Sequence, residues 1–166
     1  MKKHHLILFF VLTHLSISNA SQWAIETDPL AYLFKGYSLH LLHQKDQYCL
    51  DIGVFGLTLP NDALNHPTHD VNMNGFGLKL DYFIEFLSPS LFVGIQENSI
   101  QFQQKHEKIW RHDLGVRFGY LGNFGSTSFY WQPWSAWGPT ISDDKFSSGT
   151  QIPNSFFMAL HLGYHF

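Results

Sequence analysis

The chain has 166 residues, a formal net charge of −3 and 14% charged residues, against roughly a quarter in a typical soluble domain. It carries no basic patch and no run of Lys and Arg, so nucleic acid is not expected as a partner. Cys49 is the single cysteine, which excludes an internal disulfide and a cysteine-based metal site. We expect no cofactor.

Residues 1–20 have the order of a secretory signal peptide. Two lysines near the start precede an apolar stretch over residues 6–15, and small residues stand at Ser18 and Ala20. About ten apolar residues are too few to cross roughly 30 Å of hydrocarbon as a helix, which disfavours a helical membrane anchor. We therefore predict cleavage after Ala20 and a single domain over residues 21–166.

The rest of the chain alternates apolar and polar residues with the two-residue period of β-strands. Helical periodicity is scarce, and no apolar run is long enough for a membrane-spanning helix. In chain order, strands are expected over residues 23–26, 37–41, 48–58, 76–85, 91–102, 113–120, 127–137 and 155–166.

Two of these strands are irregular. In the fifth, the apolar positions change parity between Ile95 and Ile100, which indicates either a β-bulge or the point where the strand leaves a membrane. In the seventh, Pro133 cannot donate to a ladder, so pairing is expected to weaken there. The tryptophans around this proline are expected at an interfacial aromatic girdle: Trp131, Trp134 and Trp137.

Short and long links between the expected strands alternate along the chain. Long links are expected over residues 61–75, 104–110 and 142–154, and short ones over 44–46, 88–90 and 123–126. This alternation is typical of a barrel with short periplasmic turns, long extracellular loops and both termini on the periplasmic side. The first link, over residues 28–36, has two interpretations: Pro29 and Gly36 favour a turn, while the apolar residues between them would continue either strand.

The C-terminal segment has the clearest alternation. From Ser155 to Phe166, every even position is apolar: Phe156, Met158, Leu160, Leu162, Tyr164 and Phe166. This segment resembles the last strand of bacterial outer-membrane barrels, whose terminal aromatic residue is recognised by the assembly machinery. The resemblance assigns an assembly signal to Leu162, Tyr164 and Phe166.

In overall plan the chain resembles the small eight-stranded barrels of the OmpA and OmpX type. A sheet in lipid must close, because an open edge leaves backbone polar groups without partners. The resemblance implies an all-β, eight-stranded, antiparallel, up-and-down transmembrane β-barrel in the outer membrane of a Gram-negative-type bacterium. It implies outer-membrane lipid, lipopolysaccharide and the barrel-assembly machinery as partners. It implies no activity, and the extracellular ligand stays open.

The polar half of the alternation gives the side chains expected inside the barrel. They include both acids and bases: Glu26, His40, Asp51, Lys79, Asp81, Glu85, Arg117 and His161. Buried charges need partners, and small barrels fill their interior with side chains, so we interpret this set as a structural network of ion pairs. The alternatives are a polar pocket and a gated pore.

Catalysis and metal binding are weaker interpretations. A lipid A deacylase would need a serine, a histidine and an acid near the outer leaflet, and the His-x-Ser-Asn run of known outer-membrane deacylases is missing after residue 20. The candidate pairs are His112 with Asp113 and His40 with Ser38. The loop containing His66, His69 and Asp70 and the acidic run over 142–145 are weak metal candidates, for which solvated loops are the preferred interpretation.

The principal rival is a soluble, lipocalin-like barrel that holds a ligand inside. Alternation alone does not say which face is outside. The terminal aromatic strand, the charges on the alternate face and the glycines on that face favour lipid outside: Gly77, Gly115, Gly119 and Gly163. We therefore expect a membrane barrel with a structural, adhesion or surface-interaction role.

Overall fold

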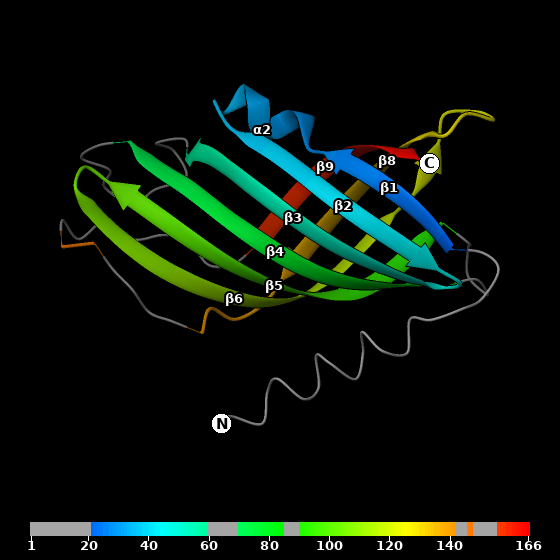
Figure 1. Ribbon diagram of the computed structural model, residues 1–166. Coiled ribbons are helices and arrows are strands. Elements are labelled where there is room, and N and C mark those ends of the chain that lie inside the picture. The colour runs from blue at the N-terminus through cyan, green and yellow to red at the C-terminus, as the bar shows by residue number, and fades with distance from the viewer. Residues whose placement is uncertain (1–20, 60–69, 85–89, 142–145, 148–155) are drawn as a thin grey trace.

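The computed structural model describes residues 21–59, 70–84, 90–141, 146–147 and 156–166. These residues form one antiparallel sheet that curls into a closed barrel (Figure 1). The predicted signal peptide lies outside the described residues, and so does Glu85.

The barrel consists of eight long strands and one two-residue strand. They are β1 (Ser21–Thr27), β2 (Tyr37–Lys45), β3 (Tyr48–Leu59), β4 (Val71–Phe83), β5 (Leu91–Gln104), β6 (Glu107–Tyr120), β7 (Gly122–Asn123), β8 (Phe129–Trp137) and β9 (Phe156–His165). From β1 to β6 each strand pairs with the next, β8 pairs with β6 and β9, and β9 pairs with β1. The short β7 adds a pairing to β8 only. The all-β, eight-stranded, antiparallel, up-and-down prediction is confirmed.

The first link is a short helix, α2 (Pro29–Leu33). The Asp28 side chain accepts a hydrogen bond from the Leu30 N–H at 2.9 Å, and Pro29 follows the cap, where its missing N–H costs no helical bond. The link therefore does not extend either strand. No helix in the described part of the chain is long and apolar enough to cross a membrane.

Two predicted link boundaries are wrong. β5 and β6 are joined by the tight turn Lys105–His106, not by a long link over residues 104–110, and Lys105 adopts a positive φ of 53°. Similarly, residues 71–75 belong to β4, not to a long link. Outward-facing Asn72, Asn74 and Lys108 replace the apolar residues that the outer face carries elsewhere, so the pattern used to recognise strands is missing from these segments.

The change of parity in β5 is not a bulge. The registers of β5 with β4 and β6 run without a break through Ile100. Ile95 is 61% exposed on the outer face, whereas Ile100 and Phe102 are 0% and 1% exposed inside the barrel. The strand keeps one unbroken pairing register, while its apolar side chains change from the outer face to the inner face.

This change divides the barrel into two parts. In residues 55–59, 71–75, 97–104 and 107–113, which we call the extension, the inner face carries an apolar cluster together with the buried Arg111–Asp113 ion pair. The buried cluster of the extension consists of Val71, Met73, Ile100, Phe102 and Phe146. The hairpin of β5 and β6 reaches far from the C-terminus (Figure 1). The apolar cluster of the extension resembles the core of a small soluble protein. In the remaining residues of the barrel, which we call the belt, apolar side chains cover the outer face.

Pro133 weakens pairing on one edge of β8 only. β8 stays in register with β9 through Pro133 and Leu160. On the other edge, pairing with β6 ends at Trp134, and β7 takes over at Trp131. A residue without an N–H therefore lies where the ladder changes partners, as expected of proline in a sheet.

Aromatic side chains gather on the outer face near the end of the barrel that carries both Ser21 and Phe166. Their ring pairs come from adjacent strands: Trp23–His43, Tyr48–Tyr82, Tyr120–Trp131 and Phe129–Tyr164. Trp131 belongs to this group of aromatic residues, as predicted for the interfacial girdle. Trp137 is exposed on the outer face farther along β8. Trp134 does not agree, because it points into the barrel.

The closed barrel predicts that Cys49 is protected from solvent. Its side chain faces inward and is 4% exposed. A maleimide should therefore label the folded protein far more slowly than the urea-unfolded protein, as followed by mass spectrometry. The double variant C49A/S126C, with its thiol at an exposed position, should label rapidly when folded. Equal labelling of folded and unfolded wild type would contradict closure around Cys49.

Candidate functional site

The structure places the expected interior charges inside the belt. Because inward positions alternate along each strand, residues from β1, β2, β3, β4, β6 and β9 meet at one level of the lumen. All the expected residues except Glu85, which lies outside the described residues, are buried there: Glu26, His40, Asp51, Lys79, Asp81, Arg117 and His161. We call this set the interior network.

Asp51 is the centre of the interior network. Its carboxylate accepts from Lys79 Nζ at 2.6 Å and lies 2.8 Å from His40 Nδ1. Asp51 and Lys79 stand directly opposite each other in the register of β3 and β4. His40 lies opposite Gly53, and a Cβ on Gly53 would collide with the imidazole. This glycine therefore makes room for the histidine, which explains a glycine on the lumen face.

Arg117 extends the network to a second carboxylate. Its Nε lies 3.3 Å from Asp81 Oδ1, and its Nη1 lies 3.9 Å from Asp51 Oδ2. The guanidinium also stacks over the Trp134 ring at 4.5 Å, an arrangement that stabilises a desolvated cation. The position of Trp134 corrects the prediction that it belongs to the aromatic girdle. Even-numbered residues of β8 face inward, and the irregularity at Pro133 obscured that parity.

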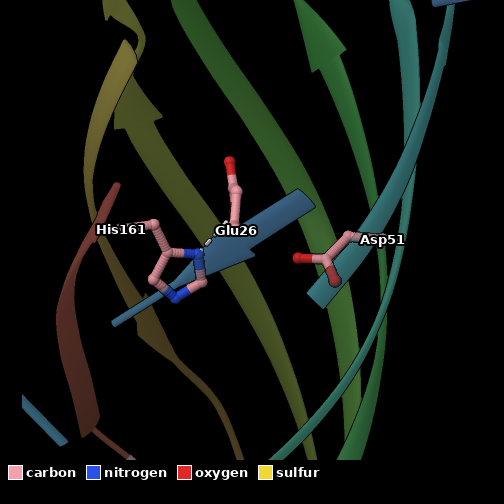
Figure 2. Close-up of side chains that lie close together, drawn as sticks. All are labelled: Glu26, Asp51 and His161. Carbon is pink, nitrogen blue, oxygen red and sulfur yellow. Dashed lines mark hydrogen bonds and ion pairs between the residues drawn. The ribbon is translucent and has the colours of Figure 1, made fainter. Parts of the chain in front are cut away.

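Glu26 and His161 join the two ends of the chain. His161 Nδ1 lies 2.6 Å from Glu26 Oε2 (Figure 2), and the two residues belong to β1 and β9, whose pairing closes the barrel. The His161 ring contacts His40 with ring centroids 4.6 Å apart. The interior network is therefore continuous from the closing strands to β4 and β6.

Glu26, Asp51 and His161 also have the composition of a metal site. One potential ligand atom from each lies within 4.8 Å of the others (Figure 2), and carboxylates with imidazole suit zinc. The same atoms, however, already form ion pairs and hydrogen bonds, and Lys79 and Arg117 supply positive charge next to them. A divalent cation would have to displace Lys79 from Asp51. The arrangement therefore fits ion pairing better than metal binding.

Little space remains beside the network. A cavity of about 110 Å³ lies between it and α2, with Ser38, His40, Trp134 and His161 among its lining residues. Ligand sites for organic molecules usually enclose about 300–1,000 Å³. The cavity is therefore of a size for a few water molecules.

The two candidate catalytic pairs lie apart or have other partners in the described residues. His112 faces outward while Asp113 faces inward, where Asp113 binds Arg111 at 3.0 Å and Thr140 at 2.9 Å. Ser38 and His40 share the inner face, but the described contacts of His40 are with Asp51, Lys79 and His161. Among the described contacts, neither candidate pair comes together, whether His112 with Asp113 or His40 with Ser38.

Other predicted residues are not tested by the structure. His66, His69 and residues 142–145 fall outside the described residues. Leu162, Tyr164 and Phe166 are exposed on the outer face at the end of β9, and their role in assembly stays a prediction. Sequence reasoning missed Trp134 as a partner of the interior charges, although strict alternation from Trp131 would have placed it inside.

Comparison with known proteins finds a likeness in structure but none in sequence. No family model and no curated protein matches the chain. Among solved structures, the crystal structure of Neisserial surface protein A is similar, with 11% sequence identity and a TM-score of 0.46 over 87% of this chain and 94% of that chain. A likeness this distant carries no argument about function, which has to be inferred from the residues of this chain.

The interior network predicts a large stability loss when one partner is removed. Arg117→Met leaves Asp81 without its cation in a site that water does not reach, which typically costs about 3–5 kcal/mol. Urea unfolding in detergent micelles, followed by gel mobility, measures this loss.

Lys108→Met is the matched control, because Lys108 is exposed on the outer face of the same strand. An exposed charge contributes roughly 0–1 kcal/mol to the free energy of unfolding. A loss of stability in R117M no larger than in K108M would show that the network does not stabilise the barrel.

Proposed function

We propose that this protein is an integral outer-membrane β-barrel with a filled lumen, which acts through the surface of its extension. The observation that carries the proposal is the distribution of side chains in the belt. Apolar side chains face outward and charged ones face inward, which is the reverse of a soluble barrel. Outward positions carry Leu39, Leu41, Ile52, Val54, Phe76, Ile95, Leu114, Val116 and Phe118, all exposed. Inward positions at the same level carry the charges of the interior network.

A soluble barrel with a ligand inside would require the opposite arrangement. Monomeric soluble proteins rarely expose continuous apolar surfaces beyond a few hundred Å², whereas a band of apolar side chains around the wall is what lipid-facing strands carry. The lipocalin-like alternative also needs an apolar chamber, but Asp51, Lys79 and Arg117 occupy the centre of the belt. The side-chain distribution therefore supports lipid outside.

The two ends of the belt suggest an orientation. Aromatic residues ring the end with the termini, as they do at membrane interfaces. At the other end the outer face turns polar with Asn72, Gln103 and Lys108, and the apolar cluster of the extension supports strands that have left the hydrocarbon. We assign the termini to the periplasm and the extension to the cell exterior. Lipopolysaccharide would then surround the base of the extension, and structural or adhesive contacts would use its outer face.

Cell fractionation tests membrane insertion directly. The protein should appear in the outer-membrane fraction and migrate faster on a gel before boiling than after, because a closed barrel stays folded in detergent. A soluble periplasmic band without this mobility shift would overturn the proposal.

A pair of lysine substitutions tests which part of the wall contacts lipid. Val116→Lys places a charge in the belt and should cost roughly 2–4 kcal/mol of folding free energy in bilayers, whereas a polar position outside the membrane costs little. Asn72→Lys, at an exposed position of the extension, is the matched control. Folding equilibria in phosphatidylcholine vesicles measure both, and equal effects would contradict the assignment of belt and extension.

The filled lumen predicts that the barrel does not conduct ions. Arg117, Trp134 and Lys79 occupy the cross-section at the level of the interior network, and small barrels of this kind leave little continuous water inside. The purified protein in planar bilayers should give no regular conductance steps, with an open trimeric porin as positive control. Reproducible steps from wild type would refute a sealed lumen.

A further inference from the structure

A serine, a histidine and a glutamate meet on the outer wall, away from the interior network. Ser99 on β5 and His112 on β6 stand directly opposite each other in the register. Glu97 precedes Ser99 by two residues and therefore faces the same side of the sheet. All three lie where the belt passes into the extension.

The three side chains are within reach of one another. Ser99 Oγ lies 2.8 Å from His112 Nδ1, and the Ser99 hydroxyl donates a hydrogen bond to Glu97 Oε1 at 3.1 Å. The Glu97 carboxylate is 3.6 Å from the same imidazole nitrogen. A serine hydroxyl within hydrogen-bond reach of an imidazole nitrogen is the first element of an activated nucleophile, and a carboxylate near that imidazole stabilises its protonated form.

We propose that Ser99, His112 and Glu97 form a hydrolase site for the acyl ester of a membrane lipid. Ser99 is the nucleophile, His112 is the general base and acid, and Glu97 stabilises the protonated imidazole. The proposal goes beyond a structural or adhesive role, and it rests on the membrane insertion proposed above, since it requires lipid at the outer wall.

The reaction balances with water as the second reactant. Ser99 Oγ attacks the ester carbonyl carbon as its proton passes to His112 Nδ1. The carbon–oxygen bond to the alcohol then breaks, and His112 returns the proton to the leaving oxygen. Water, deprotonated in turn by His112, attacks the acyl-serine, releases the fatty acid and restores the Ser99 hydroxyl. The Glu97 carboxylate lies close enough to stabilise the positive charge that His112 carries between these steps.

The position of the cluster matches the depth of a lipid ester. On the outer face, Leu114 follows His112 toward the belt and Phe76 stands opposite Ser99, and both are exposed apolar residues. Toward the tip of the extension the next outward residues are Gln101, Asn74 and the exposed Trp110, and tryptophan is enriched at membrane–water interfaces. In a lipid leaflet, the ester groups lie at this boundary between hydrocarbon and headgroups. A water-soluble ester has no comparable reason to bind here.

Two carboxamides lie on the same outer face as Ser99. Gln101 lies two residues beyond Ser99 on the same face and pairs in register with Asn74 on β4. Amide N–H groups from such side chains are suitable donors to an oxyanion that develops at the attacked carbonyl. Ser99 itself is only 4% exposed, so access requires movement of Glu97 and His112. Their side chains are 37% and 50% exposed, and exposed side chains change rotamer within nanoseconds.

A fluorophosphonate probe tests the nucleophile in the full-length protein in detergent. Mass spectrometry should find the adduct on Ser99, S99A should not react at that position, and H112N should react roughly 100-fold or more slowly, the typical contribution of a general base. The controls S135A and H43N alter outward-facing residues elsewhere and should react as wild type does. Retention of the heat-dependent mobility shift in each variant separates loss of activation from loss of the barrel.

Vesicles distinguish the two sources of acyl ester. One set contains phosphatidylethanolamine alone, and the other also contains lipopolysaccharide. Release of fatty acid that S99A abolishes, from either set, supports the proposal and identifies the lipid. If S99A releases fatty acid as fast as wild type, or if folded, inserted wild type releases none from both sets, the hydrolase proposal is overturned. The membrane-barrel proposal is unaffected by that result, because insertion is measured separately.

Discussion

A barrel wall in lipid must pair every backbone N–H and C=O with a neighbouring strand, because hydrocarbon offers no other partner. In this chain that requirement is met where β9 pairs with β1 and β8 pairs with β6. With eight strands the interior is narrow, so it has to be filled by side chains. The identity of those side chains is then set by the inward half of the alternation. In the belt that half supplies the acids, bases and glycines around Asp51 and a separate apolar cluster of Ala24, Leu42, Cys49, Phe83, Phe92 and Tyr130.

The interior network arises from that constraint. A charge inside the belt has no access to bulk water, and it persists only when an opposite charge or a hydrogen-bonding group is within reach. Asp51 meets this condition through Lys79, His40 and Arg117. Small residues are as important as the charged ones, since Gly53 and Gly163 leave room for His40 and Tyr130. Ion pairing and steric fit therefore act together to close the lumen.

The alternation predicted much of this arrangement. Parity alone assigned Asp51, Lys79 and Arg117 to the inner face, because in a strand without a bulge the side of every residue follows from one residue. Prediction from the alternation failed where the sequence of apolar and polar residues was interrupted or reversed. Pro133 concealed that Trp134 faces inward, and the outward-facing Asn72, Asn74 and Lys108 concealed that residues 71–75 and 107–110 belong to strands.

The misplaced turn between β5 and β6 explains why the cluster of Ser99, His112 and Glu97 on the outer wall was not predicted. Ser99 and His112 become neighbours only through the tight turn at Lys105–His106, which fixes the register of β5 and β6. A prediction that treated residues 104–110 as a long link left that register undefined. Long-range pairings in a sheet depend on where the turn lies, and a single sequence provides no independent evidence for its place.

The buried histidines of the interior network and the half-exposed His112 differ in whether a substrate can reach them. His40 and His161 are buried, bonded to carboxylates and in tilted ring contact with each other, so each is held by neighbours that an incoming substrate would have to displace. His112 is half exposed on a wall that, in the proposed orientation, faces the outer leaflet. A filled barrel excludes substrates from its lumen, but in the proposed orientation its outer wall is in continuous contact with lipid. If this protein carries out chemistry, the polar boundary of the wall is where reactive side chains and acyl esters meet, and the interior serves to hold that wall rigid.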